Sequence, residues 1–340
     1  MKIKLLIATD DIDYGQHLSN YLSDRHAQAF DVSLCSNIEH FKSITSSNKF
    51  DAALVEPSFA AQADLKSIIL PLLLWSDEEK HTEIPSGIEK IHKYQRISSL
   101  SIRILEGYAK VSKGSFLPYG TSAKVTACWS PNGGAGTTSV ALAYCADKAK
   151  SGKDVIYLSL ESFSSIPVFF EDSGKSISTI FEMLEKKEGD IGILINGLRR
   201  KDDKSSISYF CAPKNYDDVN ILSIDDTQAL ISACRAVADE LVVDMSSVCN
   251  KRVWQVFELA DNILLVTDNS VSARAKLDQF TTQHTIFQQI KAKTILVANK
   301  NANVPELFTD FSISLPHIES DDASAVFLTL SDYISPCFAA

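Results

Sequence analysis

A glycine-rich segment between a predicted strand and a predicted helix is the part of the chain most suited to binding chemistry. The segment is Ser130–Ser139, with the sequence SPNGGAGTTS. Residues 124–129 before it are apolar and β-prone, and residues 140–150 after it are rich in alanine with a helical period. Backbone N–H groups at the start of such a helix face an anion, and glycines let the backbone curl around it without Cβ clashes. The segment therefore predicts a phosphate-binding loop.

The loop lacks the lysine that phosphate-binding loops of the usual kind carry. In the pattern G-x-x-x-x-G-K-[ST], the lysine contacts the β- and γ-phosphates and the hydroxyl binds Mg²⁺. Thr137 stands at the lysine position, and Thr138 keeps the hydroxyl. We expect ATP to bind weakly, because a lost charge-assisted hydrogen bond costs about 1.5–3 kcal/mol. The candidate nucleotide-binding residues of the loop are Gly133, Gly134, Ala135, Gly136, Thr137, Thr138 and Ser139.

Another predicted strand of this half ends in an acid. The apolar run of residues 240–243 ends at Asp244, about 100 residues after the loop. In nucleotide hydrolases with phosphate loops, an Asp at such a strand end holds Mg²⁺. We therefore predict that Thr138 and Asp244 form a Mg²⁺ site.

The succession of these features along the second half of the chain resembles the MinD/ParA family of ATPases, whose loop pattern is K-G-G-x-G-K-[ST]. Against this pattern, Asn132 replaces the first lysine and Thr137 the second. The resemblance implies that Asn299, at the end of a later strand, hydrogen-bonds adenine. It also implies that Ser159 and Glu161 stand where the family carries the acids of its first switch region.

The first 112 residues alternate predicted strands and helices, which favours a doubly wound α/β domain with a parallel sheet. The predicted strands are residues 4–8, 30–35, 52–55 and 70–75, and the predicted helices are 14–22, 38–44, 60–69 and 97–110. Acids at the carboxyl end of the first strand stand where such folds bind ligands. These acids are Asp10 and Asp11.

This half resembles a response-regulator receiver domain. Glu56 replaces the phosphoacceptor Asp, Ser76 corresponds to the hydroxyl after the fourth strand, and Lys93 to the lysine after the fifth. The predicted receiver-like pocket is therefore Asp10, Asp11, Glu56 and Lys93. The resemblance implies a module that is used for binding and is not phosphorylated. Two interpretations of Glu56 beside Lys93 stay open, namely an imitation of the activated state and a structural ion pair.

The predicted fold class is α/β in two domains. Residues 1–112 form a receiver-like (flavodoxin-like) parallel sheet domain, 113–122 a linker, and 123–340 a degenerate MinD/ParA-type P-loop domain. Within the second domain we expect short strands at 207–211 and 219–223 and one long helix over 271–289. A weakly amphipathic helix over 323–334 lacks the basic face of interfacial helices, so we expect it to pack in the core.

Composition narrows the classes of function. The net charge of −10 disfavours nucleic acid as a partner. No apolar run approaches the roughly 18 residues that a bilayer span needs. The 7 cysteines contain no C-x-x-C pair, which indicates reduced thiols in the cytoplasm.

A receiver-like domain followed by a degenerate MinD/ParA domain resembles the TadZ/CpaE type of pilus-assembly proteins. This resemblance implies a cytoplasmic homodimer that binds ATP and Mg²⁺ and localises or organises the Flp/Tad pilus secretion machinery. It also implies recruitment to the membrane or cell pole through partners. We expect a scaffold with no efficient ATP hydrolysis.

Two other functions stay open at the level of sequence. The first is a slow MinD/ParA-type ATPase that acts as a surface-positioning switch. It needs a substitute for the missing lysines, and Lys251 and Arg252 are the nearest candidates after Asp244. The second is a receiver-containing signalling regulator, which requires transfer of phosphate to residues 1–112.

Overall fold

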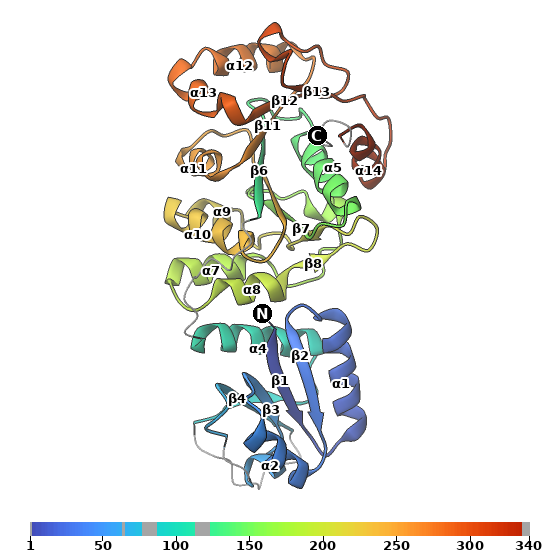
Figure 1. Cartoon of the computed structure of the whole chain (residues 1–340), viewed down its shortest axis with the longest axis vertical. Helices are drawn as coiled ribbons and strands as arrows, with labels where there is room; N and C mark the ends of the chain where they lie inside the picture. Colours follow the sequence, from blue (N-terminus) through green and yellow to red (C-terminus); the bar gives the residue numbers. More distant parts are fainter. Residues whose placement is uncertain (1, 63–64, 77–86, 113–122, 335–340) are drawn as a thin grey trace. The chain divides into compact units, whose positions relative to one another are not determined.

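The computed structural model describes residues 2–62, 65–76, 87–112 and 123–334, which form two compact units built on parallel sheets (Figure 1). The first unit contains Met1–Phe116 together with Glu188–Gly197. The second contains Leu117–Lys187 and Leu198–Ala340. The short segment of residues 188–197 therefore packs with the first unit, although it follows the glycine loop in the sequence.

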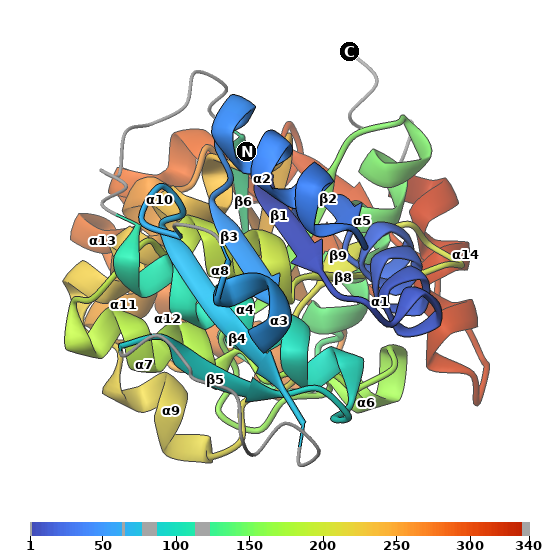
Figure 2. The ribbon, with the colours of Figure 1, turned by 90° about the horizontal axis from the view of Figure 1, so that it is seen from below.

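The sheet of the first unit has five parallel strands in the order β2-β1-β3-β4-β5 (Figure 2). This order is that of flavodoxin-like folds, in which ligands bind at the carboxyl ends of the strands. The strands are β1 (Ile3–Ala8), β2 (Phe30–Cys35), β3 (Ala52–Val55), β4 (Leu70–Trp75) and β5 (Glu89–His92).

Helices cover both faces of this sheet. One face carries α1 (Ile12–Arg25) and α4 (Ile97–Val111), and the other carries α2 (Ile38–Ser47) and the single turn α3 (Pro57–Ala60). Helix α8 (Ile191–Leu198) is preceded by Asp190, whose N–H donates to the Ala109 carbonyl at the end of α4. The core between the sheet and α2–α3 is closed by the rings of Phe41 and Phe59, whose centroids lie 5.5 Å apart.

The helix expected over residues 60–69 is wrong, because helical structure ends at Ala60. Leu65 and Ile68 are buried in the core without a helix, directly before β4. The spacing of these two apolar residues is compatible with a helix. It equally allows both side chains to reach the core from a segment that is not helical.

Among the described residues, the sheet of the second unit has eight strands in the order β13-β12-β11-β6-β10-β7-β9-β8, and only the β8–β9 pair is antiparallel. Because the other strands are parallel, their carboxyl ends lie along one edge. The strands are β6 (Lys124–Trp129), β7 (Val155–Ser159), β8 (Arg200–Lys201), β9 (Ser208–Tyr209), β10 (Glu240–Asp244), β11 (Asn262–Thr267), β12 (Thr294–Ala298) and β13 (Ser312–Ser314).

Helix α5 (Thr137–Lys150) and helix α14 (Ala323–Ile334) cover one face of this sheet (Figure 1). Helices α7, α10 and α11 lie on the other side. The remaining helices of this unit and its two 3₁₀ turns are α6 (Ile166–Phe169), α7 (Ser178–Lys186), α9 (Tyr216–Ile221), α10 (Ile224–Arg235), α11 (Lys251–Leu259), α12 (Val271–Thr281), α13 (His284–Ile290), Lys291–Lys293 and Glu306–Phe308.

Two other sequence predictions for this unit are wrong. The strand expected over 219–223 is the end of α9 and the start of α10, because Asn215 and Ser223 each begin a helix with a capping box. The long helix expected over 271–289 is two helices, α12 and α13, since the chain leaves helical geometry at Gln283.

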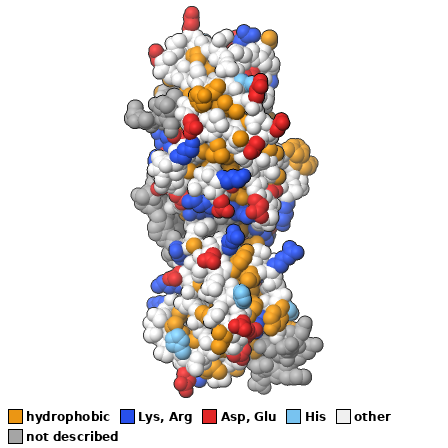
Figure 3. Space-filling view, turned by 90° about the vertical axis from the view of Figure 1, so that its right-hand side faces the viewer, with side chains coloured by type: hydrophobic (Ala, Val, Ile, Leu, Met, Phe, Trp, Pro, Cys, Tyr) orange, Lys and Arg blue, Asp and Glu red, His pale blue; other side chains and the backbone are white. Residues whose placement is uncertain are grey.

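The prediction that residues 323–334 pack in the core is confirmed. The apolar face of α14 is buried against α5 and the sheet through Phe327, Leu330 and Ile334. Among the residues that the structure describes, no helix is long and apolar enough to cross a membrane. Figure 3 shows one face of the molecule, where acidic and basic side chains are interspersed.

Truncating the apolar face of α14 tests its role in the core. Phe327 is 1% exposed and packs on Phe169 and Phe170, so Phe327→Ala is expected to lower the free energy of unfolding by about 3–5 kcal/mol. Thr329→Ala, at an exposed position of the same helix, is the control, with an expected change within about 0.5 kcal/mol. Denaturant unfolding of both variants measures the difference, and equal losses would contradict the assignment.

Candidate functional site

The glycine loop connects β6 to α5 and adopts a conformation that needs glycine at two positions. Gly134 has a φ of 81° and Gly136 a φ of 86°, both in the left-handed region. Gly136 is the N-cap of α5, and a Cβ at this position would clash with Nδ2 of Asn299. The loop is therefore specified by backbone shape, in agreement with the three glycines of the sequence.

The backbone donors of the loop are available for a ligand. In the described structure, no hydrogen bond uses the N–H groups of residues 133–139, and the first helical bond of α5 runs from Val140 N–H to the Gly136 carbonyl. Consecutive unused N–H groups at the start of a 14-residue helix concentrate positive potential there. This arrangement suits the oxygens of a phosphate chain.

Asn299 and Lys300, which follow β12, contact the loop through their side chains. The Asn299 side chain donates from Nδ2 to the Ala135 carbonyl at 2.9 Å, and its Oδ1 accepts from Lys300 N–H at 2.9 Å. The Lys300 ammonium donates to the Gly134 carbonyl at 2.8 Å. Asn299 is thus at the loop, with its amide engaged there, and an adenine contact by this residue stays a prediction.

The two residues that replace the family's lysines do not supply a charge. The Asn132 side chain is 8% exposed, donates to the Gly133 carbonyl at 3.0 Å and accepts from the Ser272 hydroxyl at 3.2 Å. Thr137 is the first residue of α5. Arg252, one of the candidate substitute cations, instead donates to the Val219 carbonyl.

Asp244 ends β10 beside the loop and is fully buried. Its Oδ2 accepts from the Tyr157 hydroxyl at 2.7 Å. The Thr138 side chain lowers the pKa of Asp244, and within the described residues Oδ1 of Asp244 has no hydrogen-bond partner. A buried carboxylate oxygen without a partner costs free energy, so the site is suited to a cation that would occupy this place.

The electrostatics of Asp244 favour a proton or a cation. Burial, and then the charge of Glu161, raise the pKa of Asp244 to about 7. Glu161 follows β7 and is itself partly buried, which raises its pKa. Thr138, Asp244 and the loop therefore fit Mg²⁺ and a phosphate chain, with Thr138 and Asp244 as the residues that would hold the ion.

The first unit has a second polar cluster at the carboxyl ends of β1 and β3. The Lys93 ammonium lies 2.7 Å from Oε1 of Glu56 and 3.1 Å from Oδ2 of Asp11. The Glu56 carboxylate also accepts from the Thr9 hydroxyl at 2.7 Å and from the backbone N–H of Asp10 at 2.9 Å. Glu56 is 1% exposed, so this pocket is filled by its own ion pair.

The structure thus brings Asp11, Glu56 and Lys93 together, while the Asp10 side chain is exposed and contributes its backbone. Burial disfavours the charge of Lys93, but hydrogen bonds and charges from Glu56 and Asp11 outweigh it and raise the lysine's pKa. The backbone N–H of Tyr14 and the Lys93 ammonium lower the pKa of Asp11.

Four residues of these sites were not predicted: Thr9, Tyr14, Tyr157 and Lys300. Tyr14 donates to the Lys93 carbonyl at 2.8 Å, and its ring lies 5.1 Å from the ammonium. Lys300 carries a usable signal, since it directly follows Asn299 at a strand end. Thr9, Tyr14 and Tyr157 carry none, because only packing decides which hydroxyl meets which carboxylate.

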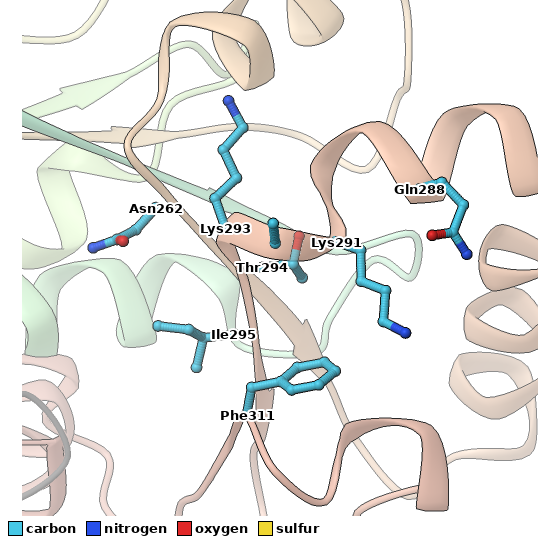
Figure 4. Close-up of a pocket in the computed structure, with 8 residues that line it drawn as sticks. Asn262, Gln288, Lys291, Lys293, Thr294, Ile295 and Phe311 are labelled. Carbon is cyan, nitrogen blue, oxygen red and sulfur yellow. The ribbon is translucent and has the colours of Figure 1, made fainter.

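A hollow of about 410 Å³ lies elsewhere in the second unit, near the amino ends of β11 and β12. Figure 4 shows that Lys291 and Lys293 on its wall point away from each other. Lys293 donates to the carbonyls of Glu258 and Ala260 at the end of α11, and Lys291 lies over the ring of Phe311. The polar groups of this hollow do not converge, so we place the candidate site at the loop.

Solved structures with the same fold are P-loop ATPases. A ParA-family ATPase from Chlorobium tepidum matches with a TM-score of 0.50 and 13% identity, over 64% of this chain and 93% of that one. A chain from the MinC:MinD cell division complex of Aquifex aeolicus matches with a TM-score of 0.50 and 15% identity, over 64% and 96%. No protein-family model matches the sequence, and no curated protein is similar to it at a significant level.

About two thirds of the chain therefore has the α/β fold of these ParA-family and MinD structures. The first unit is an α/β domain with a parallel sheet of flavodoxin-like strand order.

Breaking the buried ion pair of the first unit tests whether Lys93 is required to stabilise Glu56. Lys93→Ala leaves a buried carboxylate without its cation and is expected to cost about 3–5 kcal/mol of unfolding free energy. Removing both charges with Glu56→Gln and Lys93→Met is expected to recover most of this loss. The control is Arg103→Ala, which breaks an exposed pair with Glu89 and is expected to cost at most about 1 kcal/mol.

The raised pKa of Asp244 predicts a pH dependence of stability. The folded state binds a proton at this carboxyl up to about pH 7, whereas an unfolded Asp releases it near about pH 3.9. Without Mg²⁺, this carboxyl should therefore lower the free energy of unfolding as pH rises through this window. Asp244→Asn is expected to flatten the dependence, and Asp278→Asn, at an exposed position on α12, is expected to retain it. Unfolding curves at pH 5 and pH 8 provide the measurement.

Proposed function

We propose that this protein is an ATP-binding scaffold without efficient hydrolysis, which localises or organises the Flp/Tad pilus secretion machinery as a cytoplasmic homodimer. The observation that carries the nucleotide part is the loop of residues 133–139, with its free backbone N–H groups beside Asp244. The loop is already shaped for phosphate by two left-handed glycines and by the Asn299 side chain.

The loss of both lysines supports binding without efficient hydrolysis. Backbone N–H groups can hold the phosphates of the ground state, but the charge that develops during phosphoryl transfer requires a cation near the γ-phosphate. Asn132 and Thr137 provide none, and Asn132 is engaged within its own chain. By analogy with a phosphate-clamping arginine, the loss of rate is roughly 10³–10⁵-fold.

The pilus role and the dimer rest on the combination of the two units. The MinC:MinD complex is an example of this fold bound to a partner protein. In the first unit, the Glu56–Lys93 pair fills the pocket where a receiver domain would be phosphorylated, which favours a fixed binding module. Membrane association would then come through partners. Because Asn132 stands where the family's lysine reaches across a nucleotide-linked dimer, the proposed homodimer would form without that contact.

Calorimetric titration of the full chain with Mg-ATP, followed by a phosphate-release assay, tests the nucleotide part. We expect saturable binding that Gly136→Ala abolishes, because its Cβ would meet Nδ2 of Asn299. Gly152→Ala is the matched control, since Gly152 has the same left-handed φ of 85° but open space around its Cβ. Hydrolysis at a rate ordinary for this class would favour the slow-ATPase switch instead. The absence of binding would refute the nucleotide part.

A further inference from the structure

Phosphates bound at the loop would meet no lysine from the loop itself. A nucleoside triphosphate with Mg²⁺ keeps a net negative charge, and backbone dipoles alone stabilise it less than an ammonium does. The described structure nevertheless holds one cation against the loop, and this cation comes from a different strand.

Lys300 reaches the loop from the turn after β12. Its ammonium donates to the Gly134 carbonyl at 2.8 Å, and its Cε lies 3.9 Å from the Cβ position of Gly136. The lysine is exposed, so the ammonium is open to solvent and to a ligand. An ammonium has three donors, and two of them remain after the bond to Gly134.

The backbone that aims Lys300 is strained and held in place. Lys300 and Asn301 have φ values of 55° and 57°, in the left-handed region that residues other than glycine rarely adopt. The turn is fixed by Asn301 N–H to the Leu315 carbonyl at 2.9 Å and by Ala302 N–H to the Asn299 carbonyl at 3.0 Å. Such strain persists only where the surroundings enforce it, and it is common at ligand sites. In this turn, the left-handed backbone places the Lys300 ammonium at the Gly134 carbonyl of the loop.

We infer that Lys300 is the phosphate-binding cation of this site and replaces, from the turn after β12, the charge that Asn132 and Thr137 lack. This inference rests on the proposed nucleotide binding and adds the residue that provides its charge. The ligand class is a nucleoside di- or triphosphate. The alternative cation Arg252 is directed to the Val219 carbonyl instead.

The experiment is calorimetric titration of the full chain with Mg-ATP at low and moderate salt, using substitutions that separate charge from hydrogen bonding. Lys300→Gln keeps a donor for the Gly134 carbonyl but removes the charge, and it is expected to weaken binding at least about tenfold. Lys300→Arg keeps the charge and is expected to stay within about threefold of wild type. Lys276→Gln, at an exposed position on α12, is the control with unchanged affinity.

The outcomes separate this inference from the proposed function. Loss with Gln, retention with Arg and a weaker salt dependence in the Gln variant would support Lys300 as the cation. Wild-type binding that Lys300→Gln leaves unchanged, or that Lys251→Gln weakens instead, would overturn the inference and leave the proposed function standing. Equal losses in the Gln and Arg variants would also overturn it, because they would indicate a role in loop shape alone. No binding by the wild type would overturn both.

Discussion

The proposed binding function of the second unit depends on the free backbone N–H groups of residues 133–139. They exist because a loop and a helix start leave donors that no internal acceptor can reach. Their arrangement requires left-handed geometry at Gly134 and Gly136, and the Asn299 amide fills the space that any larger residue at Gly136 would need. The loop at the start of α5 is therefore held in its conformation by a residue about 160 positions later, directly after a strand.

Charge is distributed differently in the two units. In the first, Lys93 and Glu56 neutralise each other in a buried pocket, and this stabilises a fixed arrangement rather than an exchangeable one. In the second, Asp244 is buried with an oxygen for which the described structure gives no partner, while the exposed Lys300 donates to a carbonyl of the loop. The first pocket is filled by its own ion pair, whereas the backbone N–H groups of residues 133–139 in the second unit are not used within the described structure.

This chain shares its fold with ParA and MinD chains but has Asn132 and Thr137 where that family carries lysines. The proposed function follows from this difference. At 13–15% identity the likeness establishes the fold alone, so the function must be argued from the site. At a phosphate-binding loop, the absence of both lysines would weaken catalysis more than binding, because the transition state carries the greater demand for positive charge.

The sequence alone determined the two parallel-sheet domains, the loop and the strand-end positions of Asp244 and Asn299. These follow from local pattern and from the fact that parallel strands end at one edge. It did not determine that residues 188–197 pack with the first unit, since their apolar spacing suits either core. Only the tertiary structure decided that Tyr157 meets Asp244 and that Lys300 meets Gly134, because these contacts join segments about 90 and 170 residues apart. Such contacts depend on side-chain direction after packing, which periodicity and local propensity do not encode.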